Sequence, residues 1–392
     1  MLVGTTQIYQ LAYALVGLLL AALVLVLFFS GGLRYARRIP EGERPSVGRS
    51  SHVELIVSNA SRTRSPNVEV VDHLPKRHTF RGLPVAGFET WKIREPVLFA
   101  KRGIYELGPA EIRTTDPFGF LHLVRRFGIR TEVTVYPEVF ELAGFPLRGK
   151  QGDAGARGYF AQRGDEFSGL REYRRGDDRR HIHWKSVART GELVVKEFAQ
   201  ESPQRHAVVM DLCRPGIGTT EAEVEDAISS ASSVLYHLFR EGLPFRLLCA
   251  DKGRGSTAFG ADEAVYWRAM DLLAVVRADG DVELGELLIE KLRGGSTGEE
   301  LGEGVVLISR SLGDGFVESV EKLRAAGLSV VVVALAAHTY RTGGVASGRE
   351  GVFSGYVRRL ELAGAGVRVV RRSGGVAALA GARRAVKAEG AD

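Results

Sequence analysis

Residues 206–212 read HAVVMDL, and this short stretch is the strongest indication of how the second half of the chain folds. Its apolar residues are consecutive rather than alternating, which is typical of a strand buried on both faces of a sheet. Similar runs follow at Phe245–Ala250, Val305–Ser309, Leu328–Leu335 and Val367–Val370. Because segments long enough for helices separate these runs, the pattern predicts a mostly parallel sheet in a doubly wound α/β domain.

The segment after the first run carries clear helix signals. Thr220 and Glu223 have the spacing of a capping box, in which each side chain bonds the backbone amide of the other residue. Apolar residues then recur on one helical face as far as Leu238, and a second helix is predicted at Phe316–Ala326. No predicted helix opens with a GxGxxG or Walker-type phosphate loop, so the usual sequence support for nucleotide binding is missing.

The region before this domain has a different pattern, with short apolar segments separated by turn residues. Strands are predicted at His52–Ser58, Val68–Val71, Trp91–Ile93, Ile104–Leu107 and Val133–Val135. Short strands at close intervals, joined by polar turns, predict a small β-sandwich.

The chain begins with an uninterrupted apolar run, Leu11–Phe29, and no side chain from Met1 to Leu33 is charged. The run is close to the roughly 20 residues that a helix needs to cross a bilayer. A cleaved signal peptide would have a basic start, a shorter apolar stretch and a small-residue cleavage site, so a retained transmembrane helix is predicted. Arginines follow the run and none precedes it, which predicts a single-pass cell-membrane protein with cytoplasmic soluble domains.

Composition excludes several classes of protein. The 392 residues are 45% hydrophobic and 26% charged, which excludes a disordered or collagen-like chain. Cys213 and Cys249 are too few for a disulfide scaffold or a four-thiolate zinc site. A net charge of +6 is mild for this length and argues against a nucleic-acid partner.

These patterns predict an α+β multidomain protein with four consecutive parts. Residues 1–33 form the transmembrane anchor, residues 34–145 the β-sandwich-like domain, and residues 205–392 the doubly wound α/β domain. Residues 146–204 lie between the two folded domains. They contain a charged stretch, 164–196, with the sequence GDEFSGLREYRRGDDRRHIHWKSVARTGELVVK.

The aromatic residues in this charged stretch indicate that it is folded rather than a solvated linker. Leu193–Val195 is strand-like, and Gly176 with Asp177 forms a turn in which Asp177 is suited to cap backbone amides. Asp177 and Trp184 are expected to be structural anchors, with the Trp184 ring buried.

The charged stretch resembles the signature of the bacterial and archaeal "domain of unknown function 58" family. The matching parts are GDEF at 164–167, LREY at 170–173, GD at 176–177, RHIHWK at 180–185 and AR at 188–189. Two upstream segments, RGIYELGP at 102–109 and DPFG at 116–119, are similar to segments that precede this signature.

The resemblance implies a membrane anchor, a β-rich domain and a C-terminal domain similar to von Willebrand factor type A domains. It also implies an association with MoxR-class AAA+ ATPases and transglutaminase-like membrane proteins, although the family's biochemical activity is largely undefined. One departure is that family members often have two adjacent membrane helices, whereas this sequence shows one.

Type A domains often carry an adhesion-type metal site, with an Asp-x-Ser-x-Ser motif after the first strand and an Asp after the fourth strand. Here the first run ends at Asp211, and Cys213 and Pro215 replace the two serines. Arg310 stands where the last Asp is expected, and its cation opposes a divalent metal and is suited to pair with Asp211. The sequence therefore predicts a degenerate site, with no metal and no cofactor.

Other chemistry is weakly supported. His181 and His183 would share one face of a strand, but no third ligand with suitable spacing for zinc follows. A hydrolase centred on Arg171, Asp177, His183 and Lys185 stays an alternative, although neighbouring arginines would keep the carboxylates ionised and no complete catalytic set is visible.

The sequence thus predicts a non-enzymatic, membrane-anchored interaction protein whose partner, by resemblance, is a MoxR-class ATPase acting in the assembly or maturation of envelope complexes. The predicted partner-binding residues lie in the signature segment: Glu166, Arg171, Tyr173, Arg174, Arg175, Gly176, Asp177, Arg180, His183, Trp184 and Lys185. The hydrolase alternative requires these residues to line an open pocket. A third hypothesis, a metal-dependent adhesion module, requires another oxygen ligand beside Asp211.

Overall fold

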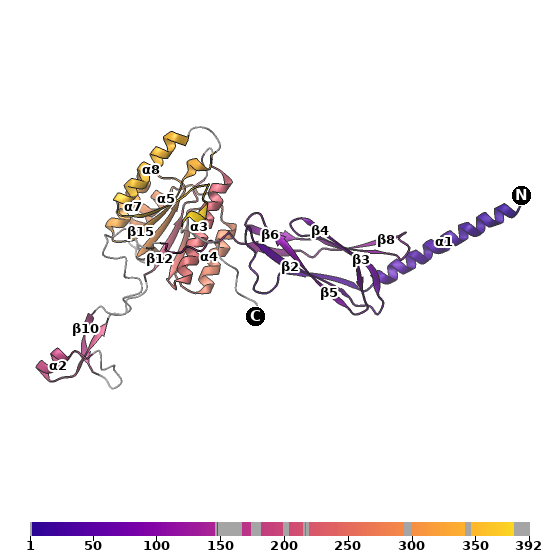
Figure 1. The fold of residues 1–392 in the computed structure, drawn as a ribbon, viewed down its shortest axis with the longest axis horizontal. Coiled ribbons are helices and arrows are strands. Elements are labelled where there is room, and N and C mark those ends of the chain that lie inside the picture. Colours follow the sequence, from indigo (N-terminus) through magenta and orange to yellow (C-terminus); the bar gives the residue numbers. More distant parts are fainter. Residues whose placement is uncertain are drawn as a thin grey trace. The chain divides into compact units, whose positions relative to one another are not determined.

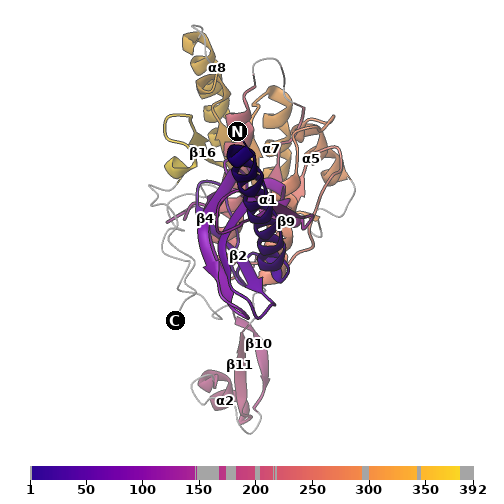
Figure 2. The ribbon, with the colours of Figure 1, turned by 90° about the vertical axis from the view of Figure 1, so that its right-hand side faces the viewer.

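The computed structural model describes residues 2–145, 147, 167–173, 182–198, 204–214, 216, 219–293, 300–341 and 346–379. Within these residues the chain is a mixed α/β protein with seven α-helices and several β-sheets, one of them parallel (Figures 1 and 2). It divides into two compact units, the first built mainly from Met1–Val139 and the second from most of the chain after Phe140. The finer domain boundaries at residues 33, 145 and 204 stay predictions.

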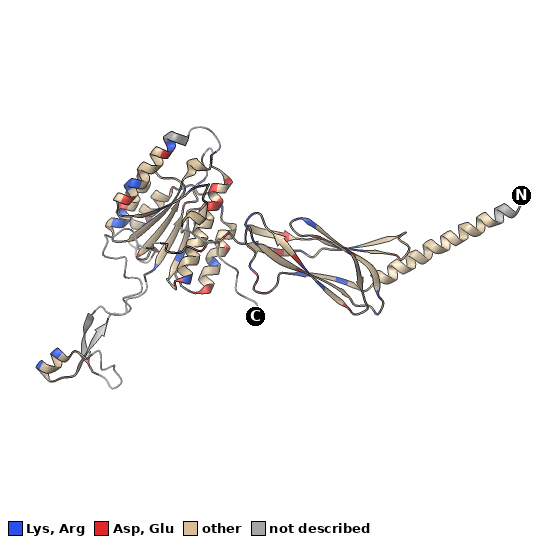
Figure 3. Ribbon diagram, viewed as in Figure 1, with Lys and Arg blue, Asp and Glu red and all other residues tan. Residues whose placement is uncertain are grey.

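Helix α1 (Leu2–Ser30) contains the apolar run, and Gln7–Ser30 is long and apolar enough to cross a membrane. Figure 3 shows no charged residue along its described part. At its C-terminal end, Arg125 Nη1 donates to the carbonyl oxygens of Ser30 (2.9 Å) and Leu33 (3.2 Å). A cation at this end of a helix satisfies free carbonyls and complements the helix dipole.

The rest of the first unit is antiparallel β-structure. Its strands are β1 (Leu33–Arg38), β2 (Ser50–Asn59), β3 (Ser65–His73), β4 (Arg77–Val85), β5 (Thr90–Leu98), β6 (Gly103–Leu107), β7 (Ala110–Thr115), β8 (His122–Phe127) and β9 (Thr131–Val135). They form sheets with the orders β1-β2-β5, β4-β3-β7-β8 and β6-β9. All five strand segments predicted for this region lie within these strands, whereas β1, β4, β7 and β8 were not predicted.

One apolar core lies between the sheets of the first unit. Alternate residues of β2, such as Val53, Leu55 and Val57, are fully buried, and they share this core with Val68 and Val70 of β3. Alternation of buried and exposed residues along antiparallel strands is what packs one face of each sheet against the other.

A buried ion pair lies within this unit. The side chains of Arg37 and Asp72 are fully buried, with Arg37 Nε donating to Asp72 Oδ2 at 2.9 Å. The Tyr35 hydroxyl also donates to Asp72, and Arg37 Nη1 donates to the Leu107 carbonyl oxygen at 2.7 Å. Both charges are therefore compensated by hydrogen bonds, as burial requires.

The second unit contains the predicted parallel sheet. Its strands, in the order β13-β12-β14-β15-β16, are β13 (Phe245–Cys249), β12 (His206–Met210), β14 (Gly304–Ser309), β15 (Ser329–Leu335) and β16 (Gly366–Val370). The helices of this sheet are α3 (Glu221–Arg240), α4 (Glu263–Val275), α5 (Leu284–Arg293), α7 (Asp314–Ala325) and α8 (Ala346–Leu362). All five predicted strands and both predicted helices are confirmed.

Helices cover both faces of this sheet. Val209, Val305 and Leu307 share a core cluster with residues of α5, α7 and α8. Their neighbours along the strands point to the opposite face, which α3 covers with buried residues such as Ala231 and Val234. Burial on both faces explains why these strands are continuous apolar runs in the sequence.

The described parts of the signature segment are folded. Strand β10 (Phe167–Glu172) pairs antiparallel with β11 (Val194–Phe198), and the short helix α2 (Trp184–Thr190) precedes β11. The tight turn between α2 and β11 uses Gly191, whose φ of 79° lies in the left-handed region that glycine favours.

Candidate functional site

The order of the parallel strands reverses at the centre of the sheet. From β12 the chain moves outward to β13, then returns to form β14 on the other side of β12. Loops that leave two such strands diverge and open a crevice at the carboxyl edge of the sheet, where ligands of α/β proteins commonly bind. A crevice of about 650 Å³ lies at this edge, lined by the loops after β12, β14 and β15.

Asp211 and Arg310 close the floor of this crevice. Asp211 follows β12 and accepts hydrogen bonds from the backbone amides of Cys213 (Oδ1, 3.1 Å) and Arg310 (Oδ2, 3.3 Å). The Arg310 guanidinium donates to the carbonyl oxygens of Asp211 (3.2 Å) and Cys213. The two charged groups themselves approach only to 4.0 Å, so most of this contact runs through the backbone.

Here the structure brings together three of the four residues of the predicted degenerate metal site: Asp211, Cys213 and Arg310. Pro215 lies outside the described residues. The Glu223 carboxyl group is the further oxygen ligand close to Asp211, but two carboxyl groups with a guanidinium and a thiol beside them do not form the oxygen-rich shell that Mg²⁺ requires, so these residues do not fit an adhesion-type metal. Within the described ranges, no group of three or more His, Cys, Asp and Glu side chains is placed to hold a metal ion.

Glu223 lies beside this pair and is 2% exposed. Its backbone amide donates to Thr220 Oγ1 at 3.3 Å, which confirms Thr220 as the N-cap of α3 in the predicted capping box. Its Oε2 atom has no hydrogen-bond partner among the described residues. Burial raises the pKa of Glu223, and the nearby positive charges of Arg310 and Arg341 only partly oppose this shift.

The other wall of the crevice is basic. Arg341 follows β15 and Arg349 lies in the first turns of α8. In the part of the chain that the structure describes, neither residue pairs with a carboxylate, and Arg341 Nε is buried without an acceptor. Helix α7 also begins here, and Gly313 at its N-cap supplies no capping side chain. Unpaired guanidinium groups and free helix amides favour an anionic ligand.

Three other charged side chains of the crevice are paired, whereas Glu283 is exposed and has no ion-pair partner among the described residues. Arg214 pairs with Asp281 at 3.2 Å, Asp314 pairs with Arg359, and His338 pairs with Glu350. These pairs leave Arg341 and Arg349 as the cations that an incoming group would meet.

The signature residues are only partly described. The Tyr173 amide donates to the Leu193 carbonyl oxygen at 2.9 Å, and His183 Nδ1 lies 2.8 Å from Ser186 Oγ. Lys185 is exposed. Glu166, Arg174, Arg175, Gly176, Asp177, Arg180 and His181, together with the side chain of Arg171, lie outside the described residues.

One expectation for this segment is wrong. Trp184 is 63% exposed, so its ring is not a buried anchor. It is the first residue of the seven-residue helix α2, where a two-stranded hairpin offers little surface to cover it. His183 occupies the N-cap of α2 instead of a strand, so it does not present its ring as one of an alternating pair.

Sequence reasoning missed three crevice residues: Glu223 as a buried acid in the crevice lining, Arg341 and Arg349. A signal for Arg341 exists, because it lies just after a predicted parallel strand and therefore near the carboxyl edge of the sheet. Arg349 reaches the crevice only through the packing of α8, which the sequence pattern did not predict.

Comparison with known proteins supports the family resemblance. Residues 169–253 match the DUF58 family, described as a protein of unknown function. This stretch contains all but the first two residues of the described signature hairpin and continues through β12, α3 and β13. No curated protein matches the chain significantly.

Solved structures resemble the chain only distantly. The CARDB domain of the PF1109 protein from Pyrococcus furiosus is 16% identical, with a TM-score of 0.20, over 26% of this chain and 86% of that domain. A β-glucosidase from Listeria innocua is 12% identical, with a TM-score of 0.16, over 26% of this chain and 16% of its own. Cwp6 from Clostridium difficile is 9% identical, with a TM-score of 0.18, over 86% of this chain and 62% of its own. Likeness at this level carries no functional argument.

Proposed function

We propose that this chain is a membrane-anchored interaction protein that binds an acidic segment of a partner protein in the crevice of its parallel sheet. Helix α1 supplies the anchor. The observation that carries the proposal is the pair of unpartnered arginines, Arg341 and Arg349, on the crevice wall. Arg310 does not compete with them, because its guanidinium is already bonded to the backbone of Asp211 and Cys213.

The charges of the crevice are suited to bind the carboxylates of an acidic peptide segment. Guanidinium groups bind carboxylates with two parallel hydrogen bonds, and such bonds strengthen where protein atoms exclude water. The raised pKa of Glu223 reduces the negative charge that would repel an acidic ligand.

We infer a binding rather than a catalytic role from the same residues. Cys213 is the thiol on the crevice floor, and burial together with the charge of Asp211 raises its pKa. A thiol with a raised pKa is a poor nucleophile, because the thiolate is the reactive form.

The partner is, by family resemblance, a MoxR-class AAA+ ATPase, and the complex acts in the assembly or maturation of envelope complexes. The same family resemblance gives transglutaminase-like membrane proteins as further partners. The arginines of the signature segment, Arg174 and Arg175, would supply a second contact for the partner. Basic and aromatic side chains of this kind are enriched at interface hot spots.

Co-purification from native membranes tests the crevice. The full-length tagged variant Arg341→Glu with Arg349→Glu should lose the ATPase, because like charges in the crevice would repel an acidic segment. The control is Arg240→Glu with Arg293→Glu, at the C-terminal ends of α3 and α5, and it should retain the ATPase.

Three results would contradict the proposal. Retention of the ATPase by the crevice variant would exclude this docking site. Loss of the ATPase in EDTA would favour the metal-dependent adhesion module. A hydrolytic activity that disappears in His183→Ala or Lys185→Ala would favour the enzyme.

A further inference from the structure

Loops of the first unit gather around the C-terminal end of α1. Strand β2 ends beside the first residue of β1, so the loop 60–64 that follows lies next to the end of α1. The loop 86–89 lies against it, since the Phe88 amide donates to the Ser61 carbonyl oxygen at 3.1 Å. Both loops therefore surround the point where the helix enters the β-structure.

A third loop, 116–121, lies at the same end. It joins β7 to β8, and Thr114 of β7 pairs with Val68 near the start of β3. Strands β3 and β7 are antiparallel, so the tip of the hairpin points in the direction of Ser65. The Ser65 hydroxyl donates to the carbonyl oxygen of Phe29 in the last turn of α1.

The hairpin tip contains the DPFG motif, and the loop exposes two phenylalanines, one in the motif and one directly after it. Asp116 accepts hydrogen bonds from the amides of Phe118 (2.8 Å) and Leu121 (2.5 Å). Although burial opposes the shift, these backbone bonds hold the pKa of Asp116 below its usual range. The Phe118 and Phe120 rings stack with centroids 6.1 Å apart, and each residue is 52% exposed.

The β7–β8 hairpin runs alongside the last turns of α1. The helix contacts β3, β7 and β8, and Ala22, Val26 and Ser30, spaced four residues apart, are its buried face. At about 1.5 Å per residue, this face extends roughly 12 Å up the helix from its C-terminal end. The tip of the hairpin therefore lies at the depth of the last turns of α1.

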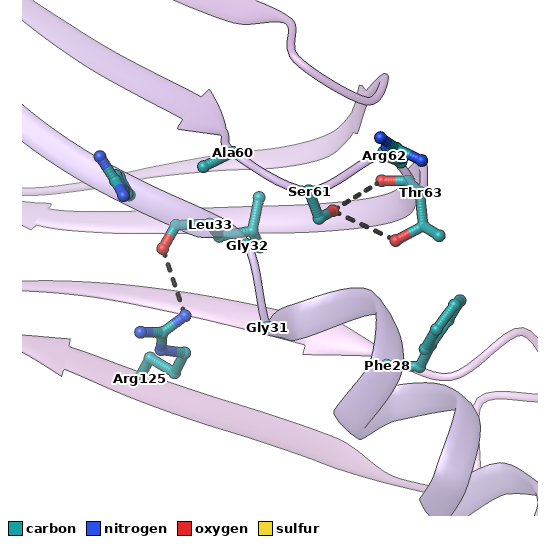
Figure 4. Close-up of a pocket in the computed structure, with 10 residues that line it drawn as sticks. Phe28, Gly31, Gly32, Leu33, Ala60, Ser61, Arg62, Thr63 and Arg125 are labelled. Atoms are coloured by element: carbon teal, nitrogen blue, oxygen red, sulfur yellow. Dashed lines mark hydrogen bonds between the residues drawn. The ribbon is translucent and has the colours of Figure 1, made fainter.

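A pocket opens between α1 and the loop 60–64. Its volume is about 490 Å³, and Figure 4 shows Phe28, Ser61, Arg62 and Arg125 around it. Arg34 also lines it. The side chains of Arg34 and Arg62 are exposed and pair with no carboxylate in the described ranges, while Arg125 holds the helix carbonyls on the opposite side. The nearby acidic side chain of Glu89 accepts the Ala86 amide of its own loop at 2.7 Å.

We propose that this end of the first unit sits in the lipid–water interface and that the pocket binds the headgroup of an anionic phospholipid. The proposal rests on the membrane anchoring by α1. Phe88, Phe118 and Phe120 insert between the acyl chains, and Arg34 and Arg62 contact the phosphate.

Two physical arguments select a lipid as the occupant. Exposed phenylalanines on two neighbouring loops, 86–89 and 116–121, and in the last turns of α1 are costly in water and stable among acyl chains. The pocket lies at the last turn of a membrane-spanning helix, which is the level of the headgroups, and unpaired arginines at that level attract anionic lipids.

A spin label tests the depth of the hairpin. Phe118→Cys and, as a control, Leu98→Cys are made in full-length protein carrying Cys213→Ser and reconstituted in lipid nanodiscs. Leu98 is 65% exposed and ends β5, opposite Ser50 at the other end of β2. Burial raises the pKa of the Cys249 thiol, so it resists labelling.

The label at position 118 should be more accessible to oxygen than to a water-soluble nickel chelate, and the label at position 98 should show the reverse. Flotation of the wild-type protein with phosphatidylcholine vesicles tests the anchor separately. Failure to float would overturn the anchor and this inference together. A floating protein whose label at position 118 is water-accessible would overturn the inference alone.

Lipid titration tests the pocket. Wild-type full-length protein in neutral detergent micelles should bind short-chain phosphatidylglycerol saturably. Arg34→Gln with Arg62→Gln should weaken binding roughly 30-fold, given a factor of about five for each arginine near a lipid surface. Lys76→Gln with Arg77→Gln, at the far end of β4, is the matched control and should bind like wild type.

Equal loss in the control pair, or no saturable binding by the wild type, would overturn the headgroup site. Inorganic phosphate that competes at millimolar concentration would also overturn it, because the pocket would then be a site for a free anion.

Discussion

At the scale of single residues, Glu223 shows how one side chain serves both the fold and the site. Its capping box with Thr220 begins α3, and its position places a buried carboxyl group beside Asp211 and Arg310. The spacing of Thr220 and Glu223 predicts the cap. The burial does not follow from spacing, because it depends on the packing of α3 against the sheet.

Glu223→Gln should make the protein more stable at neutral pH. The folded-state pKa of Glu223 is raised, so its protonated form is favoured by folding. Its contribution to stability is complete below the pKa of the unfolded chain and is lost as the pH rises through the folded-state pKa. Glutamine mimics the protonated acid and keeps the capping box.

Thermal unfolding from pH 4 to pH 8 measures this effect. The melting temperature of Glu223→Gln should exceed that of the wild type at pH 8, and the difference should shrink toward pH 4. Equal differences at every pH would show that the charge of Glu223 has no part in the effect.

Asp72→Asn should strongly destabilise the first unit. The substitution leaves the Arg37 guanidinium buried without a counter-ion, and breaking a buried ion pair in this way costs about 3–5 kcal/mol. Hydrogen exchange of the β1 and β3 amides should report the loss as faster exchange. The control, Glu106→Gln, breaks an exposed ion pair with Arg130 and should leave exchange nearly unchanged. Unchanged protection of these amides from exchange in Asp72→Asn would show that the Arg37–Asp72 ion pair does not stabilise the first unit.

Among contacts between residues far apart in the sequence, the predicted one joins the ends of two neighbouring strands. The pairing of Asp211 with Arg310 was expected, because both residues follow neighbouring parallel strands. The contact of Arg37 with Asp72 joins β1 to β3, and nothing in the sequence indicated that β1 exists. From sequence alone, an arginine in an edge strand is expected to lie on the surface unless its partner is known.

At the scale of elements, the strands of the parallel sheet were predicted closely and those of the first unit less completely. Uninterrupted Val and Leu runs are recognisable because burial on both faces leaves no room for polar residues. Strands β7 (AEIRTT) and β8 (HLVRRF) place charged residues on their outer face, and their short apolar stripe is easily missed. Strands with so few apolar residues depend on pairing partners that the sequence alone does not give.

Trp184→Ala should change the free energy of unfolding by no more than about 0.5 kcal/mol, because its ring is largely exposed. The control is Phe245→Ala in β13, which removes a fully buried ring and should cost about 3–5 kcal/mol. Chemical denaturation followed by circular dichroism compares the two variants. A loss of stability in Trp184→Ala close to that of the control would show that Trp184 is buried after all.

At the scale of the whole molecule, the two proposed sites divide the work between the units. In these proposals the first unit would contact lipid through the loops around α1, and the second would present the basic crevice to a partner protein. Each site uses arginines that have no carboxylate partner in the described chain. Neither site was visible as a sequence motif, since each is assembled from loops that are distant in the sequence.

The orientation of the chain in the membrane is the remaining whole-molecule prediction, and it places the C-terminus in the cytoplasm. Arg34, Arg38, Arg44 and Arg49 follow α1 closely, and no cation precedes it. Arg37 counts as well, although it is buried against Asp72 in the folded protein, because orientation is set during insertion, when the chain is not yet folded. External protease on intact cells should therefore leave the soluble units uncut, and lysis should expose them. Replacing Arg34, Arg38, Arg44 and Arg49 by glutamine should give a mixed orientation, seen as partial cleavage in intact cells. Complete cleavage of the wild-type protein in intact cells would reverse the orientation and would place the basic crevice where a cytoplasmic ATPase cannot reach it.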